Sequence, residues 1–293
     1  MNCSSSDDGV GPPLHFEAMN SLCPNTHLFQ IFYSEETRAM LDPGFRPLDN
    51  LENERPDWRE YWPIRNFLRN HSLIAGDYYG FFSPAFGRKT GLSSTAVFEF
   101  VRAQGGIPDL LLFSPFYDQI AFFLNQWEQG AMTHRSNDVF ERSLELVAPE
   151  FGIHRTVSSS IDSVFCNYFV AKAEFWHEWF GRCERIFECA ERGDSELAKA
   201  LGESVHYGPQ AAPAKVFVIE RVVSALIATQ PRWKVKAYNS MLLPFSGSTI
   251  SAMGLELCAL DALKIAYQSE RREQYLQAFF DLRARYAATQ PKR

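Results

Sequence analysis

Several signatures that would assign a function directly are missing from this chain of 293 residues. Its seven histidines are dispersed, without an HxxxH or HExxH spacing, which excludes zincin-type metal sites. It also lacks a Gly-rich phosphate loop and a GxSxG elbow, which excludes P-loop nucleotide hydrolases and elbow-type serine hydrolases. The six cysteines form no CxxC pair, and four lie in apolar segments, so they indicate small core residues in a reducing compartment.

Charge and hydropathy exclude two further classes. The chain has 29 Lys and Arg and 35 Asp and Glu, which gives a net charge of -6. Its basic residues form no cluster beyond scattered pairs, so nucleic acid is not expected as the main partner. The sequence has no signal peptide and no apolar run of about 18 residues. We therefore expect a cytoplasmic protein without a transmembrane segment, and its oligomeric state stays open.

What is present indicates a folded globular protein. The chain is 46% hydrophobic and 14% aromatic and includes 25 Phe, which argues against disorder. Residues 1–24 are rich in Ser, Asp, Gly and Pro and are expected to form a disordered leader. Residues 25–293 are expected to form a single domain, with a helical C-terminal extension from about residue 255.

Short apolar segments alternate with amphipathic ones, which is typical of an α/β fold. The predicted strands are residues 27–33, 77–82, 109–113 and 164–170, and the last runs into a helix from residue 172 with one apolar stripe. The sequence therefore predicts a mostly parallel central sheet flanked by helices. It also predicts a loop over residues 41–50, one central helix over 216–229 and an edge strand over 233–238.

Candidate site residues follow from the rule that open α/β sheets bind ligands at the carboxyl ends of their strands. The segments GFFSPAF and LLFSPFYD are two apolar strands closed by the same Ser-Pro turn, at Ser83 and Ser114. We expect these two ends to share one rim. Together with Tyr33 and Asp118 they would line a crevice.

Each polar candidate also has a structural explanation. Asp118 could bind a divalent cation that bridges a diphosphate, or it could cap the helix that follows. Glu220 and Arg221, the only charges on the apolar 216–229 segment, could be paired inside the fold, or Glu220 could be a general base. Asn167 either ties down a loop or faces a pocket, and Arg65 either holds phosphate or lies on a solvated face.

The order of four short blocks resembles bacterial capsule and lipopolysaccharide glycosyltransferase-like domains. The blocks are Tyr61-Trp62 with Arg65-Asn66, the strand from Asp77 to Phe81, Asn167 to Lys172 followed by Phe175, and Ile219 to Arg221, and they span roughly residues 26–235. The chain has Ser83 to Phe86 where that family has His-Tyr-Arg-Arg, and it contains no DxD motif of the GT-A type.

The resemblance implies a GT-A-like, Rossmann-like domain that moves a sugar from a nucleotide-sugar donor to a glycan acceptor in surface polysaccharide biosynthesis. Its hexosyltransferase-like activity would use Glu220 and Asp118 as catalytic residues, and Asp118 would hold Mn²⁺ or Mg²⁺ if a cation is used. Asn167 and Arg221 would face the acceptor, and the donor would be bound by Tyr33, Arg65, Ser83, Ser114 and Lys236. The alternatives are a non-catalytic nucleotide- or sugar-binding protein on the same fold, which a missing DxD would suit, and an interaction protein with an aromatic surface.

Overall fold

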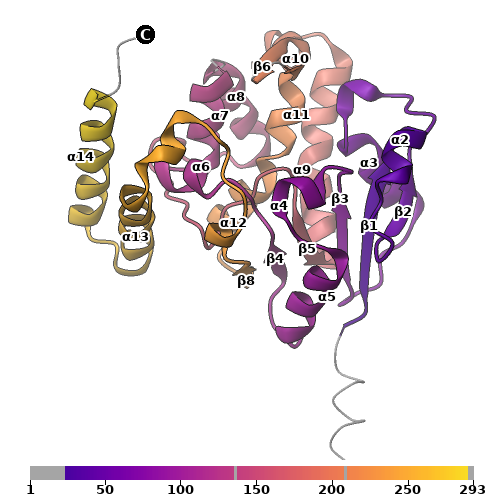
Figure 1. Cartoon of the computed structure of the whole chain (residues 1–293). Helices are drawn as coiled ribbons and strands as arrows, with labels where there is room; N and C mark the ends of the chain where they lie inside the picture. Colours follow the sequence, from indigo (N-terminus) through magenta and orange to yellow (C-terminus); the bar gives the residue numbers. More distant parts are fainter. Residues whose placement is uncertain (1–23, 135–136, 208–209, 290–293) are drawn as a thin grey trace, which may run out of the picture.

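The computed structural model describes residues 24–134, 137–207 and 210–289 (Figure 1). The expected leader therefore lies outside the described residues except for Pro24.

A central sheet of six strands organises the chain, in the order β2-β1-β3-β5-β4-β8. The pairs β1–β2, β1–β3 and β4–β8 are parallel, whereas β5 is antiparallel to both of its neighbours, β3 and β4. The fold is thus α/β with a mixed, mostly parallel sheet. The strands are β1 Thr26–Phe32, β2 Arg46–Asp49, β3 Tyr78–Phe82, β4 Leu110–Leu112, β5 Phe169–Lys172 and β8 Val235–Ala237.

Two predicted segments differ from the observed sheet. The strand expected over residues 164–170 begins only at Phe169. The backbone is left-handed at Cys166 (φ 61°) and Asn167 (φ 54°), which an extended strand does not allow. The strand also runs antiparallel to its neighbour β3. The loop expected over 41–50 contains β2, whose Pro47 is tolerated because β2 is an edge strand.

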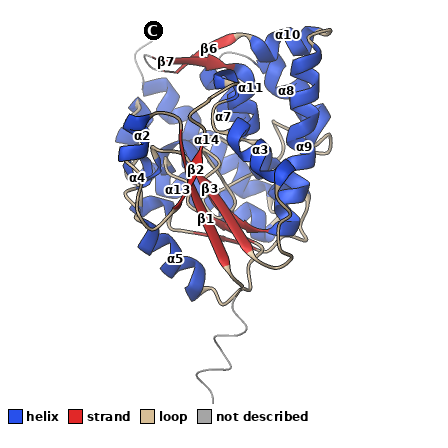
Figure 2. Cartoon of the chain, turned by 90° about the vertical axis from the view of Figure 1, so that its right-hand side faces the viewer, coloured by secondary structure: helices blue, strands red, loops and turns tan. Residues whose placement is uncertain are grey.

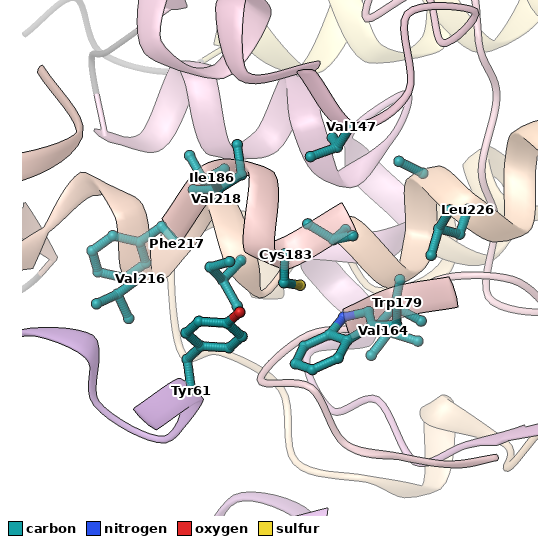
Figure 3. Packing of buried hydrophobic residues seen from close by; sticks show 14 of the residues in the cluster. Tyr61, Val147, Val164, Trp179, Cys183, Ile186, Val216, Phe217, Val218 and Leu226 are labelled. Atoms are coloured by element: carbon teal, nitrogen blue, oxygen red, sulfur yellow. The ribbon is translucent and has the colours of Figure 1, made fainter. Parts of the chain in front are cut away.

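Helices cover both faces of the sheet, as Figures 1 and 2 show. The large core on one face joins Phe81, Leu112 and Phe169 to Trp176 and Trp179 of the predicted amphipathic helix α9. Figure 3 shows part of this core. The other face packs against α4 and α5, and α5 begins after Ser93, whose side chain caps it by accepting from the Ala96 N–H. The helices of these layers are α2 Glu35–Ala39, α3 Tyr61–Asn70, α4 Phe86–Thr90, α5 Ser94–Ala103, α7 Gln126–His134, α8 Asn137–Val147, α9 Ala173–Arg192, α10 Glu196–Gly202, α11 Ala214–Ile219 and α12 Val222–Thr229.

The chain ends in a helical hairpin that packs on α6, Tyr117–Phe122. Its helices are α13, Leu255–Glu270, and α14, Glu273–Thr289. In Figure 1 they lie on the opposite side of the molecule from β1 and β2. The remaining elements are the hairpin β6 Ser204–Tyr207 and β7 Gln210–Pro213, and the short 3₁₀ helices Pro56–Trp58, Ser240–Leu242 and Thr249–Met253. None of the helices in the described ranges combines the length and the apolar character that crossing a bilayer requires.

The single helix predicted over residues 216–229 is in fact broken into α11 and α12 at Glu220 and Arg221. At the break, the Arg221 backbone N–H donates to the Val218 carbonyl at 3.0 Å, three residues back. The Phe217 carbonyl, the usual acceptor four residues back, instead accepts from Nη1 of the Arg221 side chain at 2.6 Å. The buried arginine thus replaces one backbone hydrogen bond and tightens the turn.

Candidate functional site

The two Ser-Pro turns lie at the same edge of the sheet, because β3 and β4 run in the same direction on either side of β5. Both serines are buried. Ser83 Oγ is hydrogen-bonded to Tyr168 Oη at 2.5 Å, and Ser114 Oγ accepts from the Phe165 N–H at 2.8 Å. The turns therefore hold the segment that leads into β5. Tyr33, which follows β1, is 44% exposed at this edge.

Asp118 is fully buried at the start of α6 and binds the loop that precedes α13. Its Oδ1 accepts from the Ser246 N–H at 2.9 Å, and its Oδ2 accepts from the hydroxyls of Ser246 and Ser251, the latter at 2.7 Å. A cation at Asp118 would have to displace these serines. Within the described ranges, His, Cys, Asp and Glu form no group of three or more that could hold a metal ion. We therefore derive no step through a cation.

Arg65 and Lys236 are not brought together. Arg65 forms a bidentate ion pair with Glu184 of α9, from Nε at 2.7 Å and from Nη2 at 2.9 Å, and stacks over the ring of Phe187 at 3.9 Å. This fork is thus bound within the fold rather than open to a phosphate. Lys236 is exposed on the edge strand β8.

The segment before β5 meets a lysine that the sequence did not single out. Lys89 of α4 is half-buried, and its Nζ lies 3.3 Å from Sγ of Cys166 and 5.9 Å from the ring centre of Tyr168. Burial raises the pKa of the Cys166 thiol to about 11, although the nearby Lys89 charge lowers it. A signal for Lys89 did exist, because it lies six residues after Ser83 at the carboxyl edge of the sheet.

Asn167 projects from the same strained turn. Its side-chain Oδ1 is buried and has no hydrogen-bond partner within residues 24–134, 137–207 and 210–289. A buried amide oxygen left unpaired costs about 1–3 kcal/mol, so it is a ready acceptor for a hydroxyl or amide donor of a ligand. A left-handed backbone at two successive non-glycine residues, Cys166 and Asn167, is also typical of functional sites.

Glu220 lies at the break between α11 and α12, half-buried, and makes no hydrogen bond or ion pair with the described part of the chain. Burial raises the pKa of its carboxyl group, while the charges of Lys89 and Arg221 lower it. Of the two charges, only Arg221 is bound by neighbours inside the described fold. Arg221 donates from Nε to the Gln126 carbonyl at 2.7 Å, and burial lowers its pKa to about 10.

Lys89, Cys166, Asn167 and Glu220 form what we call the Glu220 cluster. Electrostatic interactions link Glu220 to Lys89 and to Cys166, and Asn167 is the next residue in the turn. The cluster combines three features of a reactive site: a cation, and a carboxyl group and an amide oxygen that are both unpaired within the part of the chain that the structure describes. Of the residues predicted from the sequence, Asn167, Glu220 and Arg221 lie in or next to it.

No protein-family model matches this chain, and neither the curated proteins nor the solved structures include a match.

Proposed function

We propose that this chain is a glycosyltransferase that moves a sugar from a nucleotide-sugar donor to a glycan acceptor at the Glu220 cluster. One observation carries the proposal: the half-buried carboxyl group of Glu220 has a raised pKa and no hydrogen-bond partner among the described residues. A general base needs a free oxygen and a pKa closer to the working pH than that of a surface carboxylate. The four sequence blocks, which include Asn167 and Glu220, support the choice of sugar transfer over other reactions that use a base.

In an inverting transfer, Glu220 would take the proton of the acceptor hydroxyl as the hydroxyl oxygen forms its bond to the anomeric carbon of the donor sugar. The bond from that carbon to the diphosphate oxygen breaks, and the electron pair leaves with the nucleoside diphosphate. In a retaining transfer this role of Glu220 lapses.

Lys89 and Asn167 have complementary roles in this scheme. The pKa of Lys89 is raised, chiefly through its interaction with Cys166, so its ammonium group is charged and suited to the diphosphate that leaves. Asn167 Oδ1 would accept a hydrogen bond from a sugar hydroxyl. Arg221 positions Glu220 by fixing the break between α11 and α12. Asp118 and Arg65 are left out because their polar atoms are bound within the fold.

The resemblance further supports a place for the reaction in the cytoplasmic synthesis of capsule or lipopolysaccharide. Tyr33, exposed at the carboxyl edge, stays our candidate for contact with the donor nucleotide.

The test is Glu220→Gln, which keeps the shape of the side chain and removes the basic oxygen. With a panel of nucleotide sugars and glycan acceptors, the wild type should transfer or hydrolyse at least one donor, and the variant should be slower by about 10² or more. Glu99→Gln, at an exposed position of α5, is the matched control and should keep full activity. Equal rates for Glu220→Gln and wild type would contradict the base.

The same panel separates an enzyme from a non-catalytic binder. Whether the chain is an enzyme or a binder, a nucleotide sugar at 100 times its Kd should stabilise the wild type by about 2.7 kcal/mol, which is measured as a higher Tm. Stabilisation without turnover by the wild type, with every acceptor tried, would favour the binder over the transferase.

A further inference from the structure

A cavity of about 520 Å³ lies between the end of α12, the end of α13 and the loop over residues 150–157. It shares no residue with the Glu220 cluster. Its volume is within the range of about 300–1,000 Å³ that is usual for small-molecule sites. The cavity is therefore large enough for a ligand of its own.

Two arginines line this cavity, Arg155 and Arg271. Neither guanidinium group makes a hydrogen bond or an ion pair with the described residues, whereas Arg65 and Arg283 are each bound by a carboxylate. A methyl group on Gly152 would come within 2.9 Å of Arg155 Nε, so the arginine folds over a residue without a side chain. The cavity is thus lined by two exposed arginines whose positive charges no carboxylate of the described chain pairs with.

The backbone of Arg271 is also unusual. It is the C-cap of α13 and is left-handed (φ 56°), a conformation that normally selects glycine at the end of a helix. An arginine there carries a conformational cost, and such costs are concentrated at sites of function. Its guanidinium lies 5.8 Å from the ring centre of Tyr267 and makes no compensating ion pair within the described chain.

The rest of the lining is mixed, and its apolar side chains are Val157, Ile227, Ala228 and Pro231. Asp162 also lines the cavity, but its oxygens already accept from the Ser159 N–H and the Gln268 amide. Burial raises the pKa of Asp162 to about 6, so its negative charge is lost as the pH falls through that value. Glu150, the other carboxylate of the lining, is exposed.

We propose that this cavity binds a small organic anion, with its carboxylate or phosphate held between Arg155 and Arg271 and a compact apolar body against Ile227 and Pro231. Guanidinium groups are suited to both kinds of oxyanion, because their planar fork matches two oxygens. The site is separate from the proposed transfer of sugars and does not depend on it.

Calorimetric titration of the full chain tests this with four probes: benzoate, phenyl phosphate, inorganic phosphate and neutral benzyl alcohol. We expect saturable 1:1 binding of benzoate or phenyl phosphate, and the tighter of the two identifies the oxyanion. Benzyl alcohol, which lacks the charge, and inorganic phosphate, which lacks the apolar body, should bind at least about tenfold more weakly.

The double variant R155Q/R271Q should lose binding of the organic anions by about tenfold or more. The matched control R272Q changes the next residue, an exposed arginine that pairs with Glu270 and lies outside the cavity, and it should bind like wild type. Melting curves check that each variant is folded. Equal binding by the double variant, or no saturable binding of either organic anion by the wild type, would overturn the proposal.

Discussion

Asp118→Asn tests whether the buried carboxylate holds a cation, caps α6 or fixes the loop before α13. The structure favours the loop, because three donors from Ser246 and Ser251 converge on this carboxylate. In the variant, the amide oxygen must face the Ser246 N–H, which can only donate. The amide NH₂ then faces the two serine hydroxyls, which have to rotate to accept.

The expected loss follows from these bonds. Hydrogen bonds to a charged group contribute about 1.5–3 kcal/mol and neutral ones about 0.5–1.5 kcal/mol, so converting three of them costs about 3 kcal/mol in total. For a chain of this size each kcal/mol lowers the Tm by about 2–4 °C, so a fall of about 6–12 °C is expected. The measurements are urea unfolding and a thermal melt. Asp281→Asn, at an exposed carboxylate of α14, is the control and should change stability by less than about 0.5 kcal/mol.

The other two roles predict different results. A cap would leave stability nearly unchanged, because Asn caps a helix about as well as Asp. A cation site would give a wild-type protein that Mn²⁺ or Mg²⁺ stabilises and a variant that neither ion stabilises. An unfolding free energy for Asp118→Asn within about 0.5 kcal/mol of wild type would refute the reasoning from the serine contacts.

Three other outcomes concern pH, a thiol and packing. Because burial raises the pKa of Glu220 above 4.5, the folded chain binds that proton more tightly than the unfolded chain does. The contribution of Glu220 to the free energy of unfolding should therefore fall as the pH rises above about 4.5, and Glu220→Gln should lack this fall; equal slopes for the two proteins in urea unfolding would contradict this. Because the pKa of Cys166 is raised to about 11, its thiol should react with iodoacetamide at about pH 8 roughly 10²-fold more slowly than a free cysteine. Peptide mass follows the reaction, and a rate comparable to that of free cysteine would contradict the raised pKa. A methyl group at Gly80 would approach side chains of β1 and β5 to 2.9 Å, so Gly80→Ala should lower the free energy of unfolding by about 1–3 kcal/mol. The control is Gly181→Ala on α9, where a methyl group meets open space, and it should not destabilise the fold.

Much of the sheet could be predicted from local sequence, because the apolar segments that became β1, β3 and β4 are short and bounded by turn residues. The direction of β5 could not. A strand buried on both faces is apolar whether it runs parallel or antiparallel. Residues 164–168 are also buried, apart from the half-buried Cys166, so their composition indicates burial between layers and does not distinguish a crossing loop from a strand.

The candidate site was predictable only in part. Asn167 and Glu220 stood out as polar residues in apolar surroundings, and this is a signal that sequence carries. Lys89 did not stand out by its surroundings, because a lysine in a short helix usually lies on a solvated surface; only its position soon after Ser83 indicated it. The break at Arg221 could not be foreseen either, since it depends on the Gln126 carbonyl, ninety-five residues away in the chain.

The position of β5 has a consequence for synthesis of the chain. Among the described strands, β5 is the one that lies between β3 and β4 and pairs with both. The sheet therefore stays in two parts until residues 169–172 have left the ribosome. Before that point β1, β2 and β3 can form one ladder, but the apolar edge of β3 and both edges of β4 have no strand of their own chain to pair with. Unpaired apolar edges associate readily with other chains. More than half of this protein must therefore be made while its central edges are open, which is the period in which a nascent chain depends on protection by chaperones.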